Sequence, residues 1–362
     1  MSLPGLQPAP GGPLPGGYRG NLKHQKMRAY SHIPVLLSAA ALLTALSSCS
    51  KVETTERRDA SITFRSSVVT KAPVDTDGQI DRFAVWAYRS DDAATLPEVE
   101  MNGIEVYRNG TGWAYDNVRM WTDGLWYFEA LYPCPRTLGQ GIGVDLHIPK
   151  NDAQIEKDGV YISYFDGTEA GTDLMLAKAD RTYDSSAPDV SPVALDFNHL
   201  LSRVSVCAEA GDDNVTVSSL TFGGMYVYGS YNDAVEDAWQ PITKTTEDGV
   251  VQEIDQPYGD FEADLSGITF PLPAEEQVVL LPDLLLIPQT PAASGSGLNE
   301  MKVTVTYTVG TQPEETKTVF LPQDPVWQPG RHYRYTIKFA MADVTLSVEM
   351  VQWDERDYTV IF

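Results

Sequence analysis

Residues 126–132 read Trp-Tyr-Phe-Glu-Ala-Leu-Tyr and are followed directly by Pro133. Aromatic residues fit the pleated surface of a strand, and proline ends such a run because it has no amide hydrogen to donate. Residues 83–88, Phe-Ala-Val-Trp-Ala-Tyr, form a second run of this kind after the turn residues at 75–78. These two runs predict β-strands and place the chain in the all-β class.

Further strand-like segments continue toward the C-terminus. They lie at 62–69, 143–148, 193–197, 203–208, 215–222, 278–287, 302–309, 316–321, 332–339 and 345–351. Turn clusters such as Asp166-Gly167 separate them, and no sustained 3.6-residue apolar pattern accompanies them. Many short strands with turn-rich links predict β-sandwich domains. Two short helical turns are expected, at 171–178 and 231–237.

A polar stretch marked by prolines, residues 181–192, predicts a boundary between two domains. We therefore expect an N-terminal β-sandwich domain at 61–187 and a C-terminal one at 188–362.

The first 48 residues have the features of an export signal. Residues 34–46 are almost wholly apolar, Lys23, Lys26 and Arg28 precede them, and no acidic residue occurs before position 49. An apolar run of this length is too short for a stable membrane span, and the basic flank is typical of a signal peptide. Met27 is a second candidate start, and the sequence leaves that choice open.

The apolar run ends in Leu46-Ser47-Ser48-Cys49, which resembles the lipobox of bacterial lipoproteins. The resemblance implies lipidation of Cys49 and attachment to the outer membrane, with residues 49–60 as a polar tether. Two or three acyl chains hold far better than one, since each buried CH₂ contributes about 0.8 kcal/mol. The alternative is an ordinary signal peptide that carries a cysteine beside its cleavage site.

Charge limits the partners of the body. Removal of residues 1–48 takes four basic residues from the 26 of the whole chain, which leaves 22 against 50 acidic ones, a formal charge of −28. Such a surface repels nucleic acid and anionic lipid headgroups. We therefore expect no nucleic-acid partner.

The sequence carries no recognisable catalytic or metal-binding motif. His147, His199 and His332 are far apart, without metal-ligand spacing. We expect no cofactor, no metal and no enzymatic activity, and a hydrolase is the weakest alternative. Cys134 and Cys207 remain beside Cys49, and either a disulfide or two buried thiols fits them.

Aromatic residues are dense between 113 and 132. Trp113, Trp121 and Trp126 would form a sugar-stacking platform if they were exposed on one face. The competing interpretation is that aromatics this dense fill the core of a sandwich. The platform interpretation predicts a surface glycan-binding lipoprotein, and burial of the tryptophans separates the two.

Several local motifs, in order along the chain, resemble the fimbrillin family of Bacteroidales surface lipoproteins. They are Ile62-Thr63-Phe64 with 68–72, the run 83–88, Trp121 with 125–133, Asp173-Leu174-Met175-Leu176-Ala177, the segment 197–206, Leu284-Leu285-Leu286-Ile287-Pro288-Gln289, the segment 329–335, and Val351-Gln352-Trp353. The resemblance implies two transthyretin-like β-sandwich domains in tandem. It also implies a pilus (fimbria) subunit or an anchor or accessory component at the cell surface. Whether such a protein also binds ligands on host or bacterial surfaces is left open by the sequence.

The resemblance further implies assembly by exchange of β-strands between subunits. A protease would remove the first strand, about 62–69, and a strand of a neighbouring subunit would fill the groove. Lys71 is the first candidate position for that cut, and Arg65 and Arg82 are weaker ones; the alternative is that all three are ordinary surface cations. The apolar end at 358–362 is either a donor strand or the last strand of the second domain.

Overall fold

The computed structural model describes residues 60–68, 80–95, 97–134, 142–146, 160–168, 171, 173–211, 214–233, 235–247, 250–253, 257–265, 277–292, 300–340, 343–351 and 353. All of them belong to one unit, Glu56–Phe362. Cys49, Lys71 and the segment 358–362 lie outside the described residues. Every described element is a β-strand, so the all-β prediction is confirmed. Within the described ranges, no helix has the length and apolar character needed to cross a bilayer.

The N-terminal part of the chain forms a seven-stranded sheet. Its strands, in spatial order, are β1 (Phe64–Val68), β9 (Val193–His199), β8 (Met175–Tyr183), β5 (Gly124–Tyr132), β2 (Arg82–Ser90), β3 (Glu98–Asn109) and β4 (Gly112–Tyr115). The pair β1–β9 is parallel, and the other pairs are antiparallel. β9 therefore belongs to this sheet.

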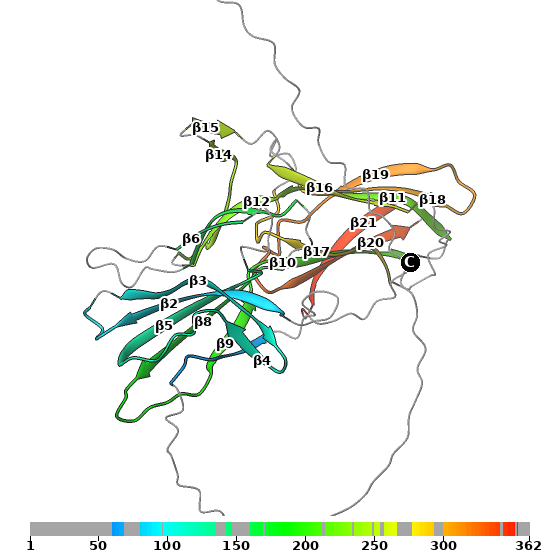
Figure 1. Cartoon of the computed structure of the whole chain (residues 1–362). Coiled ribbons are helices and arrows are strands. Elements are labelled where there is room, and N and C mark those ends of the chain that lie inside the picture. The colour runs from blue at the N-terminus through cyan, green and yellow to red at the C-terminus, as the bar shows by residue number, and fades with distance from the viewer. Residues whose placement is uncertain are drawn as a thin grey trace, which may run out of the picture. The chain divides into compact units, whose positions relative to one another are not determined.

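One face of this sheet encloses a core of its own. One face of β2 places Phe83, Val85 and Ala87 in that core, and β5 adds Trp126 and Phe128. The alternation of side chains along a strand explains why every second residue contributes. The sheet curls so that β1 contacts both β9 and β4, which are far apart in the strand order (Figure 1).

The other face of the same strands is buried as well. Trp86 and Tyr88 of β2 pack there in a second cluster that includes Phe165, Tyr231 and Trp239. These last residues belong to or flank a four-stranded sheet. Its order is β13 (Trp239–Pro241), β12 (Tyr228–Asn232), β7 (Val160–Asp166) and β6 (Ile142–Leu146). Burial of both faces accounts for the unbroken apolar run at 83–88.

The C-terminal part is a two-sheet β-sandwich. One sheet has the order β17 (Gln277–Leu286), β10 (Ser202–Ala210), β20 (His332–Ala340), β21 (Asp343–Val351), and the other has β16 (Tyr258–Asp264), β11 (Val215–Tyr226), β18 (Lys302–Val309), β19 (Glu315–Phe320). A core rich in Val, Leu and aromatic residues lies between them, and in it the ring of Phe222 packs against those of Trp327 and Tyr335. A hairpin of β14 (Lys244–Glu247) and β15 (Val250–Glu253) completes the described elements.

The structure decides three predictions about local structure. The two helical turns predicted at 171–178 and 231–237 are wrong, because β8 begins at Met175 and β12 runs through Tyr231 to Asn232. Cys134 and Cys207 are free, buried thiols, which decides the alternative left open between a disulfide and two thiols. Burial raises the pKa of the Cys207 thiol to about 11, so this thiol stays protonated at neutral pH.

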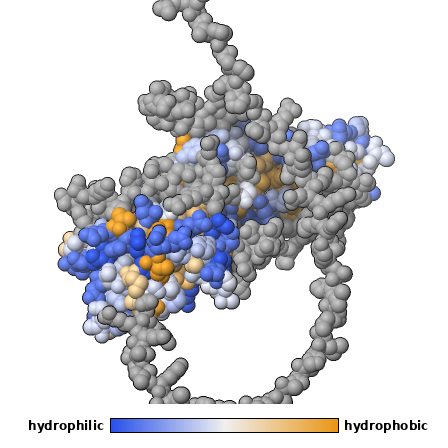
Figure 2. Space-filling model, in the orientation of Figure 1, coloured by the Kyte–Doolittle hydropathy of each residue, from blue (hydrophilic) through white to orange (hydrophobic). Residues whose placement is uncertain are grey.

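The described residues leave only scattered apolar side chains on the surface. Exposed large apolar side chains among the described residues are scattered over several strands: Val99, Tyr107, Val118, Met120, Tyr127, Val235, Phe320, Val326 and Met350. In the view of Figure 2, the coloured part of the surface is mostly hydrophilic and carries small hydrophobic patches. Scattered single residues of this kind are ordinary for a protein surface.

Candidate functional site

The first strand is held to the rest of the sheet along one side by parallel pairing. Phe64 to Val68 of β1 stand opposite Val193 to Phe197 of β9. The amide of Val193 donates to the carbonyl oxygen of Thr63 at 2.8 Å. The Ser67 hydroxyl also donates to the Asp196 carboxylate. No covalent turn joins β1 to β9, because the two strands are far apart in the sequence.

On its other side, the chain just before β1 is bonded to the segment between β4 and β5. The amide of Ile62 donates to the carbonyl oxygen of Arg119 at 2.8 Å, and the amide of Trp121 donates to that of Ala60 at 2.7 Å. The hydroxyl of Tyr115 donates to the Ile62 carbonyl oxygen at 2.9 Å. The segment 60–68 therefore lies between β9 and the segment that joins β4 to β5, and it closes the curled sheet.

The side chains of this segment divide between core and solvent. Ile62 and Phe64 are buried, whereas Thr63 and Arg65 are exposed. The Phe64 ring lies with its centroid 5.6 Å from that of Tyr115 and 6.1 Å from that of Phe128. Without the first strand, these rings would line an open apolar slot, with the unpaired edge of β9 along one side.

Two of the three candidate cleavage positions lie within paired strands. Arg65 is an exposed residue of β1, and Arg82 begins β2, where its guanidinium contacts Glu105 at 3.2 Å. Proteases cut extended backbone that can leave its neighbours, and backbone paired in a sheet resists this. Lys71, the third candidate, follows β1 and lies outside the described residues.

The aromatic residues proposed as a sugar platform are largely part of the core. Trp126 is 1% exposed and Trp121 is 5% exposed, and their rings pack at 5.3 Å. Trp121 also stacks on Tyr183 at an interplanar angle of 10°. The half-buried Trp113 is covered by the Arg108 guanidinium, 4.4 Å from its ring centre. A sugar platform would need tryptophans that are exposed side by side, and these are not. Trp121 and Trp126 are core residues.

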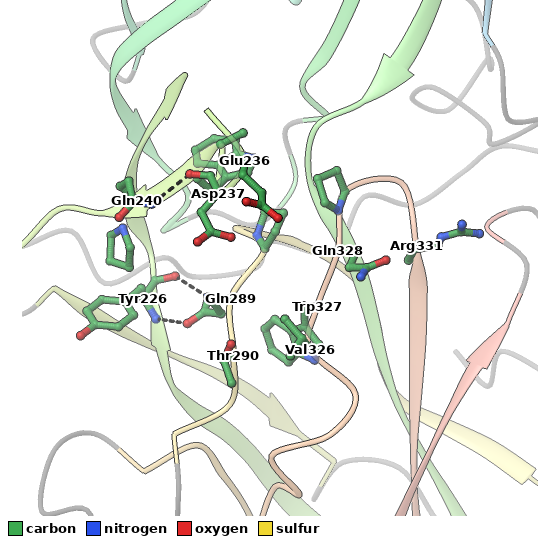
Figure 3. A pocket seen from close by; sticks show the side chains of 15 residues that line it. Tyr226, Glu236, Asp237, Gln240, Gln289, Thr290, Val326, Trp327, Gln328 and Arg331 are labelled. Atoms are coloured by element: carbon green, nitrogen blue, oxygen red, sulfur yellow. Dashed lines mark hydrogen bonds between the residues drawn. The ribbon is translucent and has the colours of Figure 1, made fainter. Parts of the chain in front are cut away.

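A concave site exists elsewhere, beside the end of β11 and beside β13 (Figure 3). Its volume is about 670 Å³, and its lining combines prolines and aromatic rings with amide and charged side chains. Gln289 forms part of its wall. Its Oε1 accepts from the amide of Tyr226 at 2.9 Å, and its Nε2 donates to the carbonyl oxygen of Tyr226 at 3.1 Å and to that of Ile287 at 3.0 Å.

Replacement of Gln289 by leucine is expected to destabilise the protein by about 1–3 kcal/mol, because it leaves the amide and carbonyl of Tyr226 buried without partners. Gln289 is only 8% exposed, so water has little access to replace the lost bonds. A urea titration of both proteins measures the difference. Gln240, which also lines the site, is a matched control: it is exposed, and the hydrogen bond of its side chain among the described residues goes to the carbonyl oxygen of Asp237. Equal effects of Gln240→Leu and Gln289→Leu would contradict this role for Gln289.

The described residues offer no metal centre. Among them, no three His, Cys, Asp or Glu side chains converge in an arrangement that would hold an ion. His199 Nδ1 instead pairs with Asp173 at 2.9 Å, and His332 Nε2 with the Ser205 hydroxyl at 2.9 Å. The sequence predicted the first strand but not the residues that contact it. Tyr115 and the edge of β9 that pairs with β1 carry no local motif that indicates this contact.

The architecture is that of an all-β protein whose first strand closes a curled sheet. No short turn connects this strand to β9, the strand with which it pairs. A family model described as fimbrillin-like matches residues 70–353, and the chain belongs to that family. No curated protein matches the sequence significantly. The family resemblance proposed from the sequence motifs is thereby confirmed.

Two solved structures illustrate the likeness. A fimbrial protein from Bacteroides vulgatus ATCC 8482 is 18% identical with a TM-score of 0.52, over 81% of this chain and 99% of that chain. A candidate cell adhesion protein from Bacteroides ovatus ATCC 8483 is 17% identical with a TM-score of 0.46, over 82% of this chain and 98% of that chain. The first of these likenesses shows a shared fold.

Proposed function

We propose that this protein is a structural subunit or anchor of a cell-surface fimbria and that it assembles by exchange of the first β-strand. Membership in the fimbrillin-like family supports the fimbrial role. The observation that carries the exchange is the position of β1. The strand pairs with β9 in parallel, buries Ile62 and Phe64, and has no turn that ties it to its partner.

The physical basis of the exchange is the state left by removal of β1. The backbone groups of β9 that pair with residues 64–68 lose their partners, and the slot beside Tyr115 and Phe128 loses its apolar filling. Both losses are costly in water. A strand from a neighbouring subunit restores the backbone hydrogen bonds, and apolar side chains at alternate positions refill the slot. An apolar alternating segment, such as 358–362, has the residue pattern that this requires.

Export as a lipoprotein completes the proposal. Lipid at Cys49 carries the precursor to the outer membrane and holds it by the tether 49–60. In a polymerising subunit the tether and β1 are then removed by a cut beyond Val68, with Lys71 as the first candidate. An anchor subunit keeps both. The partners in either case are other fimbrial subunits, and the formal charge of −28 keeps the body away from anionic headgroups.

Surface material from a Bacteroidales host that expresses the chain tests this function. A polymerising subunit gives ladders on a denaturing gel, and its N-terminus maps to the segment after Val68. An anchor remains lipidated at Cys49 and is found with fimbriae. A full-length lipoprotein that is never associated with fimbriae contradicts both roles.

A further inference from the structure

Three charged side chains from distant parts of the sequence meet on the outer face of the curled sheet. Lys178 of β8 stands directly opposite Glu129 of β5 in the strand register. Its Nζ lies 3.3 Å from the Glu129 Oε1 and is in contact with the Oδ2 of Asp233, which follows β12. One amine thus lies between two carboxyl groups.

Two buried tyrosines, Tyr88 and Tyr231, lie close to the group. The side chains of Asp233 and Glu129 are only 13% and 14% exposed, whereas that of Lys178 is 45% exposed. Burial, followed by the charge of Glu129, raises the pKa of Tyr88. Burial, followed by the charge of Asp233, raises that of Tyr231. The two carboxyl groups are therefore in a largely dehydrated environment, close to aromatic side chains.

An ion pair alone leaves this group poorly satisfied. The Oδ1 of Asp233 is buried and has no hydrogen-bond partner among the described residues. Such an acceptor loses its hydration without compensation. Burial by itself lowers the pKa of Lys178, but the hydrogen bond from Lys178 to Asp233 and the charge of Glu129 outweigh it and raise that pKa. Lys178 is therefore an ammonium that lies between Glu129 and Asp233.

We propose that Lys178 and Asp233 condense to form an intramolecular isopeptide bond, with Glu129 as the residue that transfers protons. Glu129 accepts a proton from the Lys178 ammonium, and the neutral Nζ attacks Cγ of Asp233. The new N–Cγ bond forms as one Cγ–O bond breaks. The departing oxygen takes two protons that originate from the ammonium, one of them relayed by Glu129, and leaves as water. Glu129 returns to its carboxylate form, and no oxidant or cofactor is consumed.

The surroundings favour this condensation in two ways. The amine and the carboxyl carbon are held together by the fold, which replaces a bimolecular encounter by a positioned one. The product also converts a partly buried ammonium and a buried carboxylate into a neutral amide, which removes their desolvation cost. The bond would tie β8 to the connection between β12 and β13. Its formation does not depend on the proposed function, although a fibre under load would gain from it.

Mass spectrometry of the full-length chain tests the proposal. After digestion, we expect one linked species that contains the peptides of Lys178 and Asp233 and is lighter than their sum by one water molecule. In Lys178→Arg the positive charge remains but the linked species is absent. In Glu129→Gln both reacting residues remain, and the linked species falls at least tenfold. Circular dichroism of both variants verifies that they fold.

The outcomes separate the parts of the proposal. Recovery of only unlinked peptides from the wild-type chain overturns the bond, and this result does not depend on whether any variant folds. Full linkage in a folded Glu129→Gln chain overturns the role of Glu129. A melting temperature several degrees higher for the wild type than for Lys178→Arg supports a covalent tie. Linked peptides with an absence of fimbriae would contradict the proposed function alone.

Discussion

Replacement of Phe64 by alanine is expected to lower the free energy of unfolding of the curled sheet by about 3–5 kcal/mol. Phe64 is 5% exposed, and its ring contacts those of Phe83, Tyr115 and Phe128. Alanine leaves a cavity among these rings, which belong to three different strands and cannot all move inward. No short turn connects β1 to its partner β9, so the lost packing energy weakens the attachment of β1. This is the strand that the proposed function removes.

Urea titration followed by tryptophan fluorescence measures this effect, since Trp121 and Trp126 lie in the same core as Phe64. Arg65 provides the matched control: it is the next residue of the same strand and points to solvent. Arg65→Ala should change stability by less than about 0.5 kcal/mol. Amide exchange should also rise in β9 of Phe64→Ala. A cost below about 1 kcal/mol for Phe64→Ala would show that β1 is not part of the core.

The second large effect is expected at Arg203, a residue of β10 that bonds to Asp283 of β17 and to Trp353, two residues after β21. Its Nε donates to the Asp283 Oδ1 at 2.9 Å and its Nη2 to the Oδ2 at 2.6 Å, and its Nη1 donates to the Trp353 carbonyl oxygen. Arg203 is 3% exposed. Arg203→Met should cost about 3–5 kcal/mol, with the lower value favoured because Asp283 keeps some contact with water.

A double-mutant cycle tests this assignment. Arg203→Met leaves the Asp283 carboxylate without the guanidinium that pairs with it. If this accounts for most of the lost stability, the double variant Arg203→Met, Asp283→Leu should be more stable than Arg203→Met alone. Lys338→Met is the control, since it removes an exposed ion pair with Glu209 and should cost no more than about 1 kcal/mol. Strict additivity of the two changes at Arg203 and Asp283 would contradict the buried pair.

Local patterns in the sequence predicted most of the strands. Residues 83–88 lie in β2, residues 126–132 form the last seven residues of β5, and the segments at 193–197 and 332–339 lie in β9 and β20. These runs are apolar or aromatic enough that strand formation follows from local preference and burial. The two predicted helical turns failed because their polar residues lie at strand ends, where turn composition and helix composition look alike.

Long-range pairing was beyond the reach of those patterns. β9 joins the first sheet through a parallel contact with β1, whose residues are more than one hundred positions earlier. The proline-marked stretch before β9 signals a loop but not the sheet to which the next strand returns. The meeting of Lys178, Glu129 and Asp233 has the same origin: each residue alone is an ordinary charge, and only the fold brings them together.

The aromatic residues show the same limit at the level of side chains. Density of tryptophan between 113 and 126 fits both a core and an exposed platform, because composition does not say which face of a strand is covered. Stacking of Trp121 on Tyr183 and burial of Trp126 decide it. The glycan-binding interpretation required these tryptophans to be exposed on one face, and Trp121 and Trp126 are buried.

Strand exchange is tested most directly in a purified chain that carries a specific protease site between residues 69 and 79. After cleavage and removal of the N-terminal piece by gel filtration in mild urea, the remaining body is returned to buffer and run on a denaturing gel without heating. Exchange predicts gel-resistant oligomers, and an excess of a peptide of residues 60–69 should prevent them, whereas the same peptide with Phe64→Ala should prevent them poorly. A body that loses β1 and stays monomeric, with or without the peptide, would contradict it.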